Sequence, residues 1–118
     1  MNTMLIRASL GLAVLAAGFG ASAATPQSYE EARAHIEEAR IIASPIAGVR
    51  NSLWFDYRIN VTEAQKELAT DLRNAKRFKH ERRAWDEYAH ELHGERVQYI
   101  AKMAKRGYRY AVVTVEDE

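Results

Sequence analysis

The stretch from residue 61 to residue 106, VTEAQKELATDLRNAKRFKHERRAWDEYAHELHGERVQYIAKMAKR, decides the fold of this chain. It contains no proline, and Gly94 is its only glycine. Its apolar residues recur every three or four positions, the spacing of one face of an α-helix. The stretch therefore predicts one long helix or a pair of helices. The apolar positions are Val61, Ala64, Leu68, Leu72, Ala75, Phe78, Trp85, Tyr88, Ala89, Leu92, Tyr99, Ile100 and Met103.

The residues on either side of this stretch predict two strands. Residues 53–61 (LWFDYRINV) alternate between apolar and mostly polar side chains, and residues 108–115 (YRYAVVTV) are rich in aromatic and β-branched residues. Both features are typical of half-buried strands. Gly107 stands where a glycine often ends a helix. We expect the two strands to pair, with a helical continuation through 53–61 as the alternative, because nothing there breaks the backbone.

The distance between the two strands decides whether the long helix is broken. A straight helix over 61–106 would measure about 69 Å at 1.5 Å per residue, whereas an eight-residue strand reaches back only about 27 Å. A break near Gly94, or where the apolar stripe lapses at residues 79–83, lets one chain pair its own strands. We favour this break. An antiparallel dimer that exchanges strands is the alternative.

A shorter helix is expected before these elements. Ser28 and Glu31 form a capping-box pattern, which predicts a helix from Tyr29 to about Ala43, before Pro45. Its expected buried stripe is Ala32, Ile36, Ala39 and Ala43, with Ile42 beside it. The predicted fold class is α+β, mostly α-helical, with an N-terminal helix, a strand, a long and broken helix, and a C-terminal strand in a two-stranded sheet.

The first 23 residues have the order of parts of a secretory signal peptide. Arg7 precedes the apolar run 8–20, and Ala21-Ser22-Ala23 supplies small residues for cleavage. The apolar run is shorter than the roughly 20 residues that span a bilayer. We expect cleavage near Ala23 and a periplasmic or secreted single domain over 24–118, without a transmembrane segment. An uncleaved N-terminal anchor is the alternative.

Composition limits the partners that such a domain can have. The chain has 17 Lys and Arg against 16 Asp and Glu. Only Arg7 lies in the predicted leader, so the remaining chain carries no formal net charge. A general affinity for nucleic acid is therefore not expected, and a charged partner must recognise a local patch. The absence of cysteine excludes disulfide bonds.

Residues 73–83 (RNAKRFKHERR) form the most basic patch, with a local charge of +5 after Glu81 is counted. Such a cluster can hold the phosphates of lipid, polysaccharide or other anions. The simpler interpretation is a solvated helix face, paired in part with the acidic N-terminal helix. The candidate anion-binding residues are Arg73, Lys76, Arg77, Lys79, Arg82 and Arg83.

The sequence signals for metal binding, catalysis and a protein partner are less specific than the basic patch. Glu87, His90 and His93 have the helical spacing of carboxylate–histidine metal ligands, but a bundle metal site needs a second such pair, and none is present. They are weak metal candidates, and no cofactor is expected. The sequence lacks a glycine-rich phosphate loop and a nucleophile motif. Trp54, on the polar face of the expected strand, is a candidate anchor for a protein partner unless it packs on a helix.

These features favour an exported, non-catalytic interaction or accessory protein of the cell envelope. Its expected partner is an envelope protein or an anionic envelope component, and the sequence leaves a homodimer open. The second hypothesis is direct binding of anionic lipid or polysaccharide through residues 73–83. A metal-binding protein or an enzyme is the third.

Overall fold

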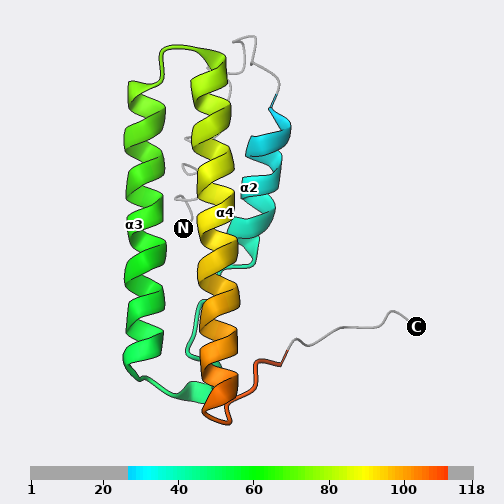
Figure 1. Cartoon of the computed structure of the whole chain (residues 1–118), viewed down its shortest axis with the longest axis vertical. Coiled ribbons are helices and arrows are strands. Elements are labelled where there is room, and N and C mark those ends of the chain that lie inside the picture. The colour runs from blue at the N-terminus through cyan, green and yellow to red at the C-terminus, as the bar shows by residue number, and fades with distance from the viewer. Residues whose placement is uncertain (1–26, 112–118) are drawn as a thin grey trace, which may run out of the picture.

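A computed structural model describes residues 27–111 of the chain, and in this part all of the regular secondary structure is helical (Figure 1). The elements are α2 (Tyr29–Ala39), the short 3₁₀ turn η1 (Ile46–Gly48), α3 (Ser52–Asn74) and α4 (Phe78–Lys105). Helices α3 and α4 form an antiparallel hairpin, and α2 packs along α4 in a parallel direction. None of these helices is long and apolar enough to cross a membrane.

The expected strand at 53–61 is wrong, because these residues begin α3. Asn51 caps the helix by accepting a hydrogen bond from the Trp54 amide at 3.1 Å. The buried positions Trp54, Tyr57 and Val61 follow helical spacing, whereas Phe55, which shares the alternating pattern, is exposed. Burial against α4 therefore selected the helical period over the alternating one, and the expected α+β class is replaced by an all-α class.

The expected C-terminal strand has no support in the part that the structure describes. Residues 108–111 form no strand, and residues 112–115 lie outside the described range. The helix end before them is as predicted. Gly107 has a φ of 92°, its amide binds the carbonyl of Ala104, and the Tyr108 amide binds the carbonyl of Met103. This is the hydrogen-bonding pattern of a helix that ends on a left-handed glycine.

The long helical stretch is broken, as we favoured, but at residues 75–77. Gly94 lies inside the continuous helix α4. Ala75 adopts an extended conformation, and Arg77 caps α4 without a side-chain hydrogen bond. Neither glycine nor proline causes this turn. The reason is tertiary: folding back here buries Val61 and Ala64 in the core that α4 also lines.

Helix α2 begins at the predicted residue, but the side of the helix that is buried is opposite to the expected one. The Ser28 hydroxyl accepts a hydrogen bond from the Glu31 amide at 3.0 Å, which confirms the predicted start. The helix ends at Ala39 rather than near Ala43. Of the expected buried stripe, Ile36, Ala39 and Ala43 are exposed, and the buried face instead carries Ala34 and Glu37. The predicted leader, residues 1–23, lies outside the described range.

Aromatic side chains hold the core together. Trp54, Tyr88, Leu92 and Met103 are the largest fully buried side chains. The rings of Tyr57 and Tyr99 stack with centroids 4.8 Å apart. Their hydroxyls accept hydrogen bonds from the backbone amides of Ile42 and Ile46, at 2.9 and 3.0 Å. These two bonds attach the connection between α2 and α3 to the helical hairpin.

Candidate anion-binding surface

The six predicted cations gather at one end of the bundle, around the α3–α4 turn. We call this group the basic turn. All six are exposed to solvent. The turn brings together side chains from the end of α3, the connection and the first turns of α4. The cations that are close in the sequence, within residues 73–83, are therefore also close in space. Its members are Arg73, Lys76, Arg77, Lys79, Arg82 and Arg83.

Only Arg82 of the basic turn forms an ion pair with another described residue. Its guanidinium donates to both carboxylate oxygens of Glu30, at 3.2 and 3.4 Å. This bond is the main reason that the pKa of Glu30 is lowered. Within the described part of the chain, the Arg73 side chain donates only to the Thr70 hydroxyl, at 3.4 Å. The expected pairing of this stretch with the acidic N-terminal helix is therefore limited to one pair among residues 27–111.

Two aromatic residues accompany these cations. Phe78 is the first residue of α4 and is 48% exposed, and the Arg82 guanidinium carbon lies 6.0 Å from the centre of its ring. Tyr29, the first residue of α2, is 72% exposed. It precedes Glu30, the partner of Arg82, so it lies at the same end of the bundle. The basic turn is thus a mixed cationic and aromatic surface.

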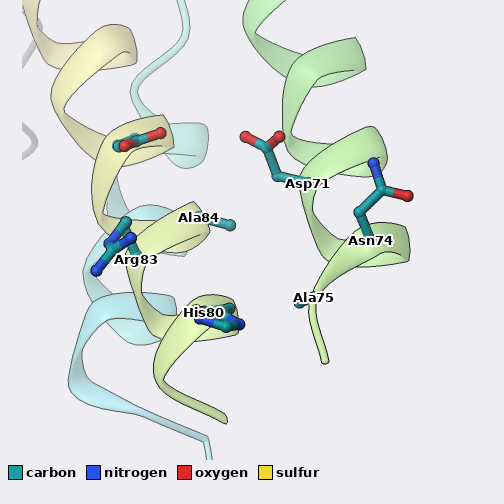
Figure 2. Close-up of a pocket in the computed structure, with 7 residues that line it drawn as sticks. Asp71, Asn74, Ala75, His80, Arg83 and Ala84 are labelled. Carbon is teal, nitrogen blue, oxygen red and sulfur yellow. The ribbon is translucent and has the colours of Figure 1, made fainter. Parts of the chain in front are cut away.

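A shallow hollow of about 240 Å³ lies beside the basic turn, between the end of α3 and the start of α4. Figure 2 shows Asp71 pointing from α3 toward α4, and Ala84 pointing from α4 toward α3. Besides them, Asn74, His80, Arg83 and Glu87 contribute to the lining. Both charge signs line this space, so it marks a boundary between two charged surfaces and offers no uniform binding site.

On the other side of this boundary, two rows of carboxylates face one another. Each row repeats every four residues along its helix, and the rows meet because α3 and α4 are antiparallel. Burial raises the pKa of Glu91, and the neighbouring charge of Glu67 raises it further. We call this group the acidic seam. Its members are Glu63, Glu67 and Asp71 on α3, and Glu87, Glu91 and Glu95 on α4.

The acidic seam and the inward charged face of α2 were not predicted from the sequence. The four-residue spacing of carboxylates is visible in the sequence, but the pairing of the two rows depends on where the chain turns. In α2, Glu37 binds Arg96 and Glu38 accepts a hydrogen bond from the Tyr88 hydroxyl at 2.7 Å. Neither partner is marked by a local motif.

The three weak metal candidates are not brought together as one site. Glu87 lines the hollow next to α3. His90 lies on the α2 side, with its Nδ1 2.9 Å from the Asp86 carbonyl oxygen, and His93 has its Nδ1 3.6 Å from a Glu37 oxygen. Among the described residues, no three histidine or acidic side chains are placed to hold a metal ion.

Trp54, the candidate partner anchor, lies in the core. It packs near Tyr57 and Tyr99, with ring centroids 6.2 and 5.9 Å away, and its indole N–H has no hydrogen-bond partner among residues 27–111. Its candidacy depended on an exposed strand face. In a helix at this position the side chain faces α4, so Trp54 stabilises the bundle and presents no surface to a partner.

Comparison with known proteins adds no relative. The chain matches no family model, no curated protein and no solved structure.

Proposed function

We propose that this chain is an exported, non-catalytic binding protein whose basic turn attaches it to an anionic component of the cell envelope. One observation carries the proposal. Five of the six clustered cations make no ion pair with any described residue, although the same helices form ion pairs along the α2–α4 contact. A protein that needed these charges only for its own stability would be expected to pair more of them.

The strength of this attachment depends on local charge. The five remaining cations, set against Glu81, give the basic turn a net charge of +4 once Arg82 is counted as neutralised by Glu30. Exposed charges are screened over about 8 Å at physiological ionic strength. Binding should therefore weaken strongly as the salt concentration rises.

A salt series on envelope extracts tests the proposal. The protein, produced with its own leader and purified after export, is immobilised and exposed to extract at low and high salt. The variant Arg77→Gln with Lys79→Gln should lose the bound anionic material. The control, Lys102→Gln with Lys105→Gln, removes the same charge from the exposed far end of α4 and should retain it. Equal losses in both variants, or no loss in either, would contradict a role for the basic turn.

A second candidate function, binding of an envelope protein, is favoured by the outward apolar face of α2. Tyr29, Ile36 and Ala39 are exposed on one side of this helix, and exposed apolar patches often mark protein contacts. The same extract experiment separates this function, because such a partner should stay bound at high salt. The substitution Ile36→Ser should release it, whereas the basic-turn variant should not.

A further inference from the structure

The geometry points to an anionic lipid bilayer as the component that the basic turn binds, with the bundle end-on to the membrane and Phe78 entering the headgroup region. This inference rests on the proposed function and specifies its ligand. Lipid phosphates supply the negative charge, and each Lys or Arg held near such a surface strengthens binding by about fivefold.

The aromatic residues favour a membrane over a soluble polyanion. Phe78 lies in sequence between Arg77 and Lys79, and about half of its side chain is exposed to water. A hydrated polysaccharide offers no apolar environment for this ring, whereas the boundary between headgroups and acyl chains does. Tyr29, at the same end, has the combination of apolar ring and polar tip that is enriched at membrane interfaces.

The position of these groups sets the orientation. The basic turn joins the end of α3 to the start of α4, so its side chains lie at an end of the hairpin (Figure 1). The acidic seam runs along the side of the same hairpin, and an anionic surface would repel it. A contact through the end brings the cations to the membrane and keeps the carboxylates of Glu63, Glu67, Glu91 and Glu95 farther away.

The opposite end of the bundle provides a matched control. Phe55 is 43% exposed there, and the Arg50 guanidinium carbon lies 5.3 Å from the centre of its ring. This pair resembles Arg82 and Phe78 at the basic turn. That end also carries Lys102 and Lys105 in the last turn of α4. We favour the basic turn because Tyr29, 72% exposed, adds a second aromatic ring beside its cations.

The test compares binding to vesicles and to heparin, using the protein produced with its own leader and purified after export. The vesicles contain equal parts of phosphatidylglycerol and phosphatidylcholine, and pure phosphatidylcholine vesicles give the background. Phe78→Ala should weaken vesicle binding about three- to tenfold, because the half of the ring that is exposed can gain about half of the free energy of full burial, and should leave heparin binding unchanged. Phe55→Ala should change neither. Thermal melts confirm that both variants fold.

The outcomes distinguish anion binding by the basic turn from binding to a lipid membrane. Arg77→Gln with Lys79→Gln should weaken binding to both ligands, about 25-fold on vesicles. If this variant weakens both and Phe78→Ala changes neither, the basic turn binds anions without a membrane, and only the lipid inference is overturned. If the charge variant changes neither ligand, the proposed function fails as well. A loss with Phe55→Ala instead of Phe78→Ala would place the membrane contact at the opposite end and overturn this inference.

Discussion

The Arg96 guanidinium of α4 and the Glu37 carboxylate of α2, 59 residues apart in the chain, form an ion pair that solvent scarcely reaches. The side chains are 11% and 12% exposed. Around them α2 meets α4 through polar groups, including the pairs Arg33–Asp86 and Arg82–Glu30. Charged side chains therefore form a large part of the contact between α2 and α4, which substitutions can test directly.

Removal of one partner of this pair should destabilise the protein. We expect Arg96→Met to lower the free energy of unfolding by about 3 kcal/mol, because it leaves the Glu37 charge nearly buried without its main partner. The double substitution Glu37→Leu with Arg96→Met should recover most of this loss, since no charge then remains buried. Chemical denaturation measures both changes. A double variant as unstable as the single one would contradict the assignment.

An exposed pair provides the comparison. Arg82→Gln, which breaks the contact with Glu30, should lower the free energy of unfolding by less than about 1 kcal/mol. If Arg82→Gln lowered the free energy of unfolding as much as Arg96→Met, the burial of an ion pair would not decide how much its removal destabilises the protein.

The docking of α2 should weaken in acid. The Arg82 hydrogen bond lowers the pKa of Glu30. Burial raises the pKa of Glu37 and Glu38, but the hydrogen bonds from Arg96, Tyr88 and His35, with nearby positive charges, outweigh it and lower both. Carboxyls with lowered pKa contribute stability that is present above their unfolded value of 4.5 and is lost as the pH falls through the folded pKa.

His35 acts in the opposite direction. Its hydrogen bond to Glu38, at 2.8 Å, is the main cause of its raised pKa. It therefore contributes stability that is fully present below pH 6.5 and is lost as the pH rises through the folded pKa. Hydrogen exchange of α2 amides against pH should show strongest protection between about pH 5 and 6.5. His35→Asn should flatten the alkaline side, and it should also weaken the acid side slightly because His35 helps to lower the pKa of Glu38. An unchanged alkaline side would exclude this role of His35.

The two tyrosine hydroxyls that hold the α2–α3 connection should each contribute measurably. Tyr99→Phe leaves the buried Ile46 amide without its 3.0 Å partner, and we expect a loss of about 1–3 kcal/mol. Tyr57→Phe should have a similar effect through Ile42. Tyr110→Phe, at an exposed position, serves as the control and should change the melting temperature little. Equal melting temperatures for all three variants would exclude this role of the hydroxyls.

Neutralisation of the acidic seam should stabilise the bundle. Burial and the charges of Glu67, Glu87 and Asp71 raise the pKa of Glu91, so its ionised form is unfavourable in the folded protein. Glu91→Gln should increase the free energy of unfolding at neutral pH by about 0.5 kcal/mol, as expected for relief of like-charge neighbours. The gain should shrink in high salt and in acid. Glu81→Gln, outside the seam, should give no such gain.

Features of the fold that depend on neighbouring residues could be predicted from the sequence. Ser28 starts α2 and Gly107 ends α4 because their hydrogen bonds close within a few residues. The basic turn was predictable as a cluster of cations, because all six lie within 73–83. The sequence also suggested pairing with the acidic N-terminal helix, but only the structure shows that Arg82 and Glu30, 52 residues apart, are the pair that forms among residues 27–111.

Tertiary contacts decided the remaining features. The alternation at 53–61 and the helical spacing of Trp54, Tyr57 and Val61 coexist in one sequence, and burial against α4 selected the helix. The break at 75–77 lacks a local signal, because it follows from the gain in folding α3 back on α4. In α2, the ion pair of Glu37 with Arg96 and the hydrogen bond from the Tyr88 hydroxyl to Glu38 hold the acidic face inward and leave Ile36 in solvent. Local hydrogen bonds thus set where helices begin and end, whereas burial and long-range charge pairing set which faces meet.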